Sequence, residues 1–589
     1  TDFIEGVGYY GWDRGDYLLP DTAWVMENQI KPLGANWISI GANVFQENIT
    51  STQIRLDYDW GMNDEDVIYL IGLAKENGLR VFLKPWVGIR YGADDASLAG
   101  RAMDFGSDEE KWTEWFDSYT EFILHYAQMA EEYQVDMFSI GAELYTGPQS
   151  GQVIGPIRRT QNFETLIAKV REIYSGPLTY SAHWKGELKY IQFWDKLDYI
   201  GIDAYYNLTT YPHATVEQLV NSWEGPIADI EKLSEKWNKP IIFTEIGYTS
   251  TESTTMYPGW PDGFPNDPVD LQIQANAYEA AFQALQDQPW WHGVFWSNWK
   301  SVFGYGGPNN RDFVPSGKPA EDVLRHYYGG TPRSITPTPV IEPVQVLFDE
   351  AHNERNTLSR ENAEKLNPTY PDAAYFGELE RSLNDVFLFT SNFDAPLTRE
   401  LLQDYDVLFL SAPRSFFRES EINAIHTFIE NGGGLIVLGA CGYEYPLNLI
   451  ISHYGITFES PCLFKDSEVD YYNSDKEFNN GFFTISNFED HPVTKFPRFF
   501  MGWSGQSLKV TSPAVPLAYT DERVWADSYP YDEHDEDDLM GPFTVIAASE
   551  AGTGRIVAFS SNNYGDIGFD FRSTHYMMRS ALEWVMHFE

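Results

Sequence analysis

The chain has 589 residues, and its composition already excludes several classes of protein. At roughly 100–200 residues per domain, this length predicts two or three domains. Hydrophobic residues make up 43% of the chain and charged residues 22%, a composition typical of a globular protein rather than a disordered or collagen-like one. Acidic residues outnumber basic ones by 87 to 40, which gives a formal net charge of −47. Such a charge repels nucleic acids and anionic membranes, so neither is expected as a partner.

The aromatic content narrows the class of ligand. Aromatic residues make up 16% of the chain, and many stand beside polar residues rather than inside apolar runs. We therefore expect a neutral ligand with flat faces, such as a sugar. No run approaches ~20 apolar residues, so no membrane span is expected. The acidity, together with a start at Thr1, leads us to expect a secreted or extracytoplasmic protein.

The chain contains two cysteines, Cys441 and Cys462. They could form one disulfide, but the fold cannot depend on a disulfide framework, and a zinc cluster built from cysteines is excluded. We expect neither a cofactor nor a bound metal.

Up to about residue 330, strand-like apolar runs alternate with amphipathic stretches, a pattern typical of a parallel sheet covered by helices. The eight runs are Phe3–Tyr9, Trp37–Ile40, Val81–Val87, Met137–Ile140, Leu178–Ala182, Tyr199–Ala204, Ile241–Thr244 and Val294–Trp296. Stretches long enough for a crossover helix are Glu65–Glu76, Trp112–Tyr133, Phe163–Tyr174, Glu224–Trp237 and Leu271–Gln286. Because this is the element count of a (β/α)8 TIM barrel, we predict that fold for residues 1–330.

A Pro-rich segment separates this region from a second domain. Residues 331–343 read TPRSITPTPVIEP, which favours an extended linker. Residues 344–589 again alternate, with strand-like runs at Val344–Phe348, Val407–Leu410, Leu435–Leu438, Val545–Ala547 and Ile556–Phe559 and helical stretches at Arg399–Asp404 and Glu419–Asn431. We predict a smaller open-sheet α/β domain of the flavodoxin-like kind.

Two glutamates stand where a TIM barrel carries its reacting groups, at the carboxyl ends of strands. Glu143 in MFSIGAELY follows the fourth predicted strand, and Glu245 in IIFTEIGY ends the seventh. Inward-reaching side chains on these opposed strands can approach to about 5–5.5 Å, the carboxyl spacing of retaining glycosidases. The alternative is that each glutamate pairs with a Lys or Arg at the barrel rim.

These motifs resemble those of glycoside hydrolase clan A. GAELY, KPWVG, GIDAYY, FTEIGY and FVPSGKPAEDVL together are most similar to family 113, the β-mannanases of that clan, over about residues 1–330. The resemblance implies that Glu143 is the acid/base and Glu245 the nucleophile. Ala142 stands where most of the clan has the Asn that holds the sugar 2-hydroxyl; family 113 also lacks this Asn, so that contact is unassigned.

Further residues follow the predicted strands and are candidates for binding substrate. Tyr205 or Tyr206 is expected to hydrogen-bond the nucleophile and keep it ionised, with Tyr205 preferred; the alternative for either is a core aromatic. The remaining candidates are Lys84, Trp86, Arg90, His183, Trp296 and Trp299. Each also has a structural alternative, such as a buried ion pair for the lysine or packing for the aromatic rings.

The second domain contains three motifs that could indicate chemistry. Cys441 in GGGLIVLGACGY resembles the nucleophile position of class I glutamine amidotransferases, but Tyr443 replaces the motif's Gly and His491 is the only candidate partner. The domain is more similar to the inactive amidotransferase-like modules of some β-galactosidases, so we expect a non-catalytic role and a homo-oligomer formed through it. The motif DEAH at 349–352 spells a helicase signature, but the chain has no phosphate-binding loop of an NTPase, so we reject that interpretation. The acidic patch at 532–538 is either a solvated loop or a Ca²⁺ site.

Three functions are compatible with these observations. The first is a retaining endo-β-1,4-mannanase that acts on mannan or glucomannan by double displacement, with a neutral oligo- or polysaccharide as substrate. The second is an exo-acting β-mannosidase or β-galactosidase in which the second domain or a neighbouring subunit closes one end of the site. The third is a non-catalytic carbohydrate-binding scaffold, against which the presence of both Glu143 and Glu245 argues.

Overall fold

The computed structural model describes residues 3–11, 15–48, 50–56, 62–89, 105–144, 155–259, 267–301, 306–308, 310–333, 343–368, 371, 374–383, 386–465, 482–485, 487–494, 500–503, 505–522, 524–527, 538–562 and 572–587. The chain divides into two compact units, Thr1–Thr336 and Pro337–Glu589. The division lies inside the Pro-rich segment at 331–343, most of which is outside the described residues. None of the described helices has both the length and the apolar character that a membrane span requires.

The first unit is a closed parallel barrel, as predicted. Its strands pair in the order β1-β9-β8-β7-β6-β5-β4-β2, and β2 pairs with β1 to close the ring. The short β3 (Ile54–Arg55) pairs antiparallel with the end of β2. The barrel strands are β1 (Ile4–Tyr9), β2 (Trp37–Gln46), β4 (Arg80–Ile89), β5 (Met137–Ala142), β6 (Leu178–His183), β7 (Ile200–Asp203), β8 (Ile241–Ile246) and β9 (Trp291–Trp299).

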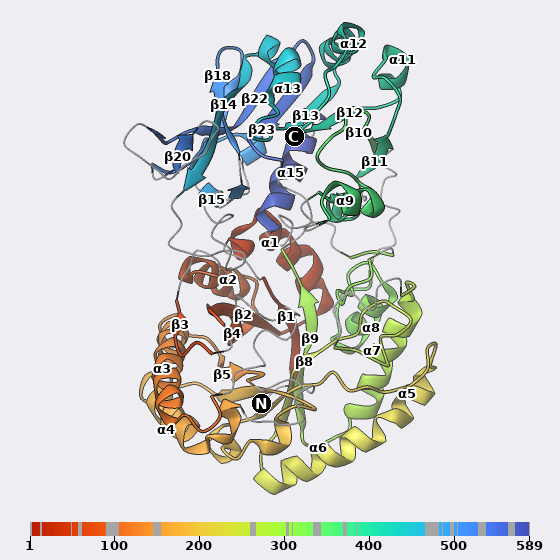
Figure 1. Cartoon of the computed structure of the whole chain (residues 1–589). Helices are drawn as coiled ribbons and strands as arrows, with labels where there is room; N and C mark the ends of the chain where they lie inside the picture. Colours follow the sequence, from red (N-terminus) through yellow and green to blue (C-terminus); the bar gives the residue numbers. More distant parts are fainter. Residues whose placement is uncertain are drawn as a thin grey trace. The chain divides into compact units, whose positions relative to one another are not determined.

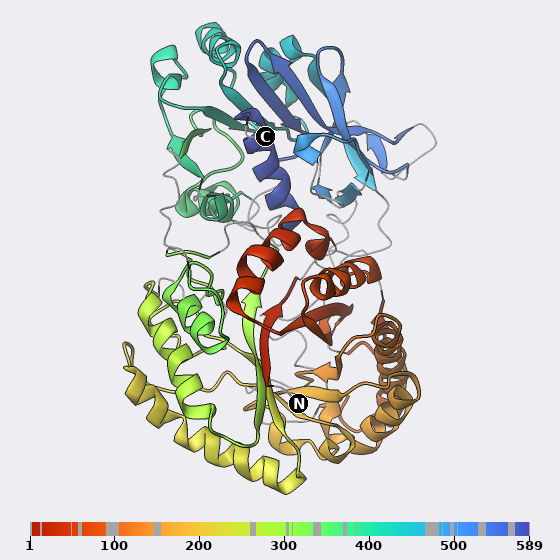
Figure 2. The same cartoon turned by 180° about the vertical axis from the view of Figure 1, so that it is seen from behind.

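Helices surround this barrel on the outside (Figures 1 and 2). They are α1 (Pro20–Val25), α2 (Asp64–Glu76), α3 (Glu109–Glu132), α4 (Thr160–Ile173), α5 (Val216–Ser222), α6 (Glu224–Trp237), α7 (Leu271–Leu285) and α8 (Pro319–Tyr327). The crossover from β6 to β7 differs from the others, because it contains the short 3-10 helices Leu188–Tyr190 and Trp194–Lys196. The fully buried Phe193 and Trp194 fill this side of the barrel instead of a longer helix.

The barrel interior is apolar at its amino end and polar toward its carboxyl end. One buried cluster, contributed by six strands, consists of Ile4, Trp37, Phe82, Met137, Ile242 and Phe295. The next inward-facing positions on three of these strands are Ser39, Lys84 and Thr244, because successive side chains of a strand point to opposite faces. Polar side chains therefore collect near the strand ends where TIM barrels carry their sites.

The second unit is built on a mixed sheet with strand order β11-β10-β12-β13-β23-β22-β19-β16. The first five strands are parallel and have the 2-1-3-4-5 order of flavodoxin-like folds, which confirms the predicted open sheet. The strands are β10 (Val344–Asp349), β11 (Phe387–Asn392), β12 (Val407–Ser411), β13 (Gly434–Leu438), β16 (Asn487–Phe488), β19 (Val515–Tyr519), β22 (Thr544–Ala551) and β23 (Gly554–Phe559).

Helices cover both faces of this sheet. One apolar core contains side chains of α10 (Gly377–Leu383) and α15 (Arg572–Val585), and the other contains side chains of α12 (Glu419–Glu430) and α13 (Glu444–Ile451). Two short helices are α9 (Arg360–Leu366) and α11 (Arg399–Leu402). Two antiparallel sheets complete the unit, formed by β14 (Ile456–Lys465), β18 (Gln506–Val510), β20 (Val524–Asp527) and β21 (Leu539–Met540), and by β15 (Phe482–Ile485) and β17 (Phe500–Trp503).

Candidate active site

Glu143 directly follows β5, and its backbone adopts a left-handed conformation with φ of 49°, which few residues other than glycine adopt. A side chain at Gly141, where φ is 147°, would collide with the hydroxyl of Tyr119 from α3. That hydroxyl donates a hydrogen bond to the carbonyl of Ile140 at 2.9 Å, and the N–H of Glu143 donates to the carbonyl of Ser181 at 2.9 Å. These contacts fix Glu143, which is 7% exposed, at the carboxyl end of the barrel.

Glu245 lies on β8, and both of its carboxylate oxygens have partners. The ammonium group of Lys84 on β4 forms an ion pair with Oε1. The hydroxyl of Tyr205, which follows β7, donates to Oε2 at 2.8 Å and is itself hydrogen-bonded to the Ser297 hydroxyl on β9 at 3.0 Å. The Glu245 side chain remains 21% exposed. Lys84 from the far side of the barrel and Tyr205 from the neighbouring strand therefore orient one carboxylate that solvent still reaches.

Lys84 is charged although it is buried inside the barrel. Burial alone would lower the pKa of Lys84, but the carboxylates of Asp203 and Glu245 outweigh burial and hold that pKa well above its usual range. The ammonium group also lies 4.8 Å from the ring centre of Tyr10, which adds a cation–π contact. Of the two expectations for Lys84, a contact to sugar hydroxyls or a buried ion pair with a carboxylate, the structure shows the ion pair.

Two further carboxyl groups lie near the site and were missed in the sequence. Asp203 ends β7 and accepts a hydrogen bond from Thr244 at 2.7 Å. Burial raises the pKa of Asp203, and the carboxylates of Glu245 and Glu143 raise that pKa further, whereas the Lys84 ammonium lowers it. Glu187 accepts hydrogen bonds from the Tyr180 hydroxyl at 2.9 Å and from a backbone N–H at 3.0 Å. Burial, followed by the Glu143 carboxylate, holds the pKa of Glu187 well above its usual range.

The arrangement provides an oriented carboxylate, Glu245, and a second, buried carboxyl group, Glu143, at the same end of the barrel. Asp203 is within electrostatic range of both. Two carboxyl groups are what enzymatic hydrolysis of a glycosidic bond commonly uses. Residues 90–104, 145–154, 260–266 and 302–305, which follow β4, β5, β8 and β9 in the sequence, lie outside the described residues.

Residues 8–318, more than half of the chain, match the family model described as Glycoside Hydrolase Family 113. The chain belongs to glycoside hydrolase family 113. Among solved structures it is similar to a GH113 beta-1,4-mannanase in a complex, with 27% sequence identity and a TM-score of 0.48. That match covers 56% of this chain and 99% of the mannanase chain. The chain is also similar to the GH113 beta-mannanase AaManA from Alicyclobacillus acidocaldarius in complex with ManMIm, with 25% identity over 56% and 98% of the two chains and a TM-score of 0.48. No curated protein matches the chain.

The second unit of this family 113 glycoside hydrolase matches a different model. Residues 362–483 match the IFT52 GIFT domain. A solved structure of the mmIFT52 N-terminal domain covers 41% of this chain and 97% of that chain, with 16% identity and a TM-score of 0.32. The predicted similarity to amidotransferases is not confirmed. Cys441 is joined to Cys462 in a disulfide, so it has no free thiol, and His491 packs its ring against Trp584 at 4.9 Å.

The remaining aromatic and histidine candidates in this glycoside hydrolase divide between the site and the core. Tyr206 is buried and packs against Trp184 and Trp223, with ring centres 4.6 and 5.6 Å apart, so it takes the core position that was its alternative. His183 ends β6 and is partly buried, and its Nδ1 accepts the N–H of Gly186 at 3.0 Å. That bond fixes the turn that brings in Glu187.

The expectation that Trp296 stacks on a sugar is wrong. Trp296 is fully buried on the outer side of β9, with its ring stacked on Tyr278 of α7 at 3.9 Å. Trp299 is also fully buried, so the structure places it in the packing alternative as well. Trp86 lies on β4, two residues beyond Lys84 toward the carboxyl end of the barrel, and is partly exposed. It stays a candidate for binding substrate. Arg90 lies outside the described residues.

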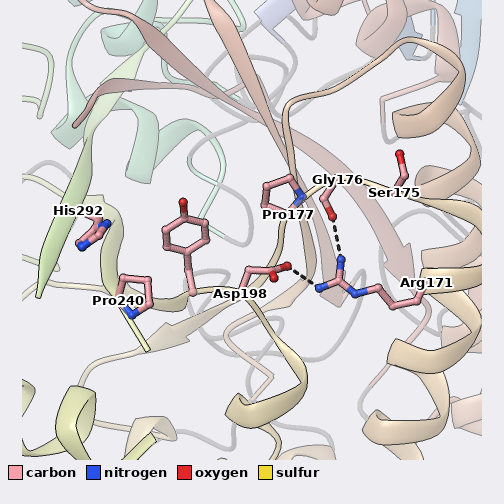
Figure 3. Close-up of a pocket in the computed structure, with 8 residues that line it drawn as sticks. Arg171, Ser175, Gly176, Pro177, Asp198, Pro240 and His292 are labelled. Carbon is pink, nitrogen blue, oxygen red and sulfur yellow. Dashed lines mark hydrogen bonds and ion pairs between the residues drawn. The ribbon is translucent and has the colours of Figure 1, made fainter. Parts of the chain in front are cut away.

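A surface hollow lies at the opposite, amino end of the barrel (Figure 3). An ion pair between Arg171 and Asp198 crosses it, and Arg171 also donates to the carbonyl of Gly176 at 2.8 Å. The lining residues precede β6, β7 and β8 or begin β9. This end of a TIM barrel contributes to stability, so the hollow is not the candidate active site of the glycoside hydrolase.

Proposed function

We propose that this glycoside hydrolase is a retaining endo-β-1,4-mannanase that acts on mannan or glucomannan by double displacement. The observation that carries the proposal is the pair of carboxyl groups at the carboxyl ends of the fourth and seventh barrel strands. Glu245 is paired with Lys84 and Tyr205, and Glu143 is buried on the strand opposite.

In this proposal Glu245 attacks the anomeric carbon and forms a glycosyl-enzyme intermediate. A carboxylate must be ionised to attack, and both of its partners favour the ionised form: the Lys84 ammonium by its charge and the Tyr205 hydroxyl by donating a hydrogen bond. Each carboxylate oxygen has two lone pairs, so a partner on an oxygen does not block attack by that oxygen.

Glu143 would protonate the departing sugar oxygen and later deprotonate the attacking water. Glu143 is 7% exposed, and a carboxyl group shielded from water in this way suits a proton donor. The left-handed backbone at Glu143 supports a functional role, because such conformations persist where the surrounding structure holds a group in place.

The substrate class follows from the family and from the charge. The sequence motifs resemble the β-mannanases of family 113, and mannan and glucomannan carry no charge. A net charge of −47 opposes binding of polysaccharides rich in uronic acids. A neutral β-linked polymer is therefore the substrate that we propose.

Proton NMR during hydrolysis of β-1,4-mannopentaose tests the substrate, the stereochemistry and the mode of attack together. We expect the β-anomer to form first, with a ladder of shorter oligosaccharides as products. Initial α-anomer would contradict double displacement. Monosaccharide as sole product would favour the exo-acting β-mannosidase, and hydrolysis of β-galactosides but not mannosides would favour the β-galactosidase.

Replacing each glutamate by alanine and adding azide tests the two roles separately. Glu245→Ala should turn over only with azide and yield an α-azide from a β-glycoside with an activated leaving group. Glu143→Ala should keep the first step on activated substrates and yield a β-azide. A β-azide from Glu245→Ala would show that the two roles are reversed.

A further inference from the structure

The loop that follows β10 in the second unit gathers three buried ionisable side chains. Asp349 ends β10, and His352 and Glu354 follow within five residues; none is more than 6% exposed. One possible ligand atom from each lies within 4.8 Å of the other two. Among the described residues, no other group of His, Cys, Asp or Glu side chains has this geometry.

The histidine and the aspartate of this cluster are held by residues from two other elements. Nδ1 of His352 lies 2.6 Å from Oδ2 of Asp349, and Nε2 lies 3.2 Å from Oε1 of Glu421 in the first turn of α12. Asn392, at the end of β11, donates to Oδ1 of Asp349 at 2.7 Å. These contacts orient His352 and Asp349 within the cluster.

Glu354 has a buried oxygen that no donor satisfies. Its Oε2 accepts the N–H of His352 at 3.0 Å, whereas no described residue donates to the buried Oε1. In the described part of the chain no lysine or arginine forms an ion pair with Asp349 or Glu354. A buried carboxylate oxygen without a donor is costly, and a cation bound at Oε1 of Glu354 would remove that cost.

We propose that the cluster binds one divalent transition-metal ion, of the Zn²⁺ or Mn²⁺ kind, through Nδ1 of His352 and one carboxylate oxygen each from Asp349 and Glu354. Two carboxylates neutralise the charge of a divalent ion. An imidazole among the ligands selects such ions over Mg²⁺ and Ca²⁺, which bind oxygen ligands.

The surrounding contacts suit this coordination. With Nδ1 on the metal, the Nε2–H of His352 donates to Glu421, which is the orienting bond that metal-bound histidines commonly make. Ligand atoms around a tetrahedral ion at about 2.0–2.1 Å are about 3.3 Å apart, and the three possible ligand atoms lie within 4.8 Å of one another. We expected no bound metal from the sequence, in which Asp349 and His352 begin and end the DEAH motif and Glu354 lies two residues beyond it.

The site lies where this sheet topology binds ligands. The strand order reverses between β10 and β12, and the cluster follows the carboxyl end of β10 at that switch point. A metal here would tie the loop after β10 to the first turn of α12 through His352 and Glu421. We therefore assign the ion a structural role in the second unit.

Titration of the full-length, chelator-treated protein with Zn²⁺ tests the proposal. Surface carboxylates also attract cations, so the variant Glu354→Gln is compared with Glu350→Gln in 0.15 M salt (about the physiological ionic strength). Glu350 is a matched control, since its carboxylate already accepts hydrogen bonds from Thr357, Leu358 and Ser391. Glu354→Gln preserves the side-chain shape and removes the charge, and a calorimetric unfolding transition of the second unit verifies that this unit is folded.

We expect one tight Zn²⁺ site per chain in the wild type and in Glu350→Gln, weakened at least ~100-fold in Glu354→Gln because a ligand is lost. Co²⁺ should give the intense visible bands of a four-coordinate nitrogen and oxygen site in the wild type and not in Glu354→Gln. Absence of a stoichiometric site in the wild type would overturn the proposal and indicate that Glu354 shares a proton with Asp349. Equal affinity in the wild type and Glu354→Gln would also overturn it.

Discussion

The hydroxyl of Tyr205 donates a hydrogen bond to Oε2 of Glu245 at 2.8 Å, whereas the adjacent Tyr206 packs against Trp184 and Trp223. Adjacent tyrosines in one motif thus have different surroundings and provide a matched pair of variants. Tyr205→Phe should lower kcat by about 10–100-fold, since a hydrogen bond to a charged group contributes about 1.5–3 kcal/mol.

Tyr206→Phe should keep kcat within about twofold, because its ring supplies the contacts that the structure shows. Steady-state kinetics on a β-mannoside distinguish the two variants. An equal loss in both would mean that the hydrogen bond to Glu245 does not support catalysis.

The ion pair between Lys84 and Glu245 predicts a loss of activity when the ammonium group is removed. Lys84→Met leaves Glu245 and Asp203 without their buried counter-ion, so kcat/KM should fall by roughly 10²-fold or more. Steady-state kinetics on a β-mannoside measure the loss. A kcat/KM within about twofold of the wild type would show that the ion pair does not support catalysis.

The sequence predicted the barrel well because each barrel strand is an apolar run flanked by turn residues. The edge strand β11 was missed, since its side chains alternate between buried and exposed positions rather than forming an apolar run. The positions of Glu143 and Glu245 followed from strand order. The hydrogen bond from Tyr205 to Glu245 was also predicted, and the structure shows it. The carboxylate that pairs with Lys84 was not predicted: Lys84 and Glu245 are 161 residues apart, and strand ends alone do not tell which side chains meet inside a barrel.

Asp203 illustrates a signal that could have been used. It ends the strand in GIDAYY, the position that identified Glu245 on another strand, but that motif was interpreted only through its tyrosines. Trp296 illustrates the opposite limit. An aromatic at a strand end faces either the barrel mouth or a helix, and only the register of β9 places Trp296 against Tyr278.

Glu187 predicts a pH dependence of stability in the barrel. Its pKa in the folded protein is raised by burial above the value of about 4.5 for an exposed glutamate, so the folded state binds more protons than the unfolded state above that pH. Stability should therefore fall as pH rises through this window, and Glu187→Gln should flatten the decrease. Melting temperatures from pH 5 to 8 test this, with the exposed Glu110→Gln as control. Parallel curves for wild type and Glu187→Gln would contradict the prediction.

The disulfide between Cys441 and Cys462 predicts separate effects on stability and hydrolysis. It links residues 21 apart, and a loop of this length corresponds to about 3 kcal/mol of stabilisation. The double variant Cys441→Ser/Cys462→Ser should therefore lower the unfolding temperature of the second unit and leave hydrolysis unchanged. Calorimetry and mannan hydrolysis check the two effects. A loss of hydrolysis at a temperature where the barrel is folded would show that the second unit contributes to the activity.

A chain ending at Thr336 tests what the second unit contributes. The two core clusters of the barrel contain residues only up to Tyr328, and those of the second unit begin at Val344, so neither core needs side chains from the other unit. The shortened chain should therefore fold, because the barrel closes through its own strands, and should give the same anomer from short oligosaccharides.

We expect the shortened chain to lose self-association, solubility or affinity for long polysaccharides, since an appended unit without chemistry of its own is retained for contacts. Light scattering and kinetics on mannan and on mannopentaose measure these properties in both chains. Equal solubility, mass and kinetics on both substrates would exclude such a role for the second unit.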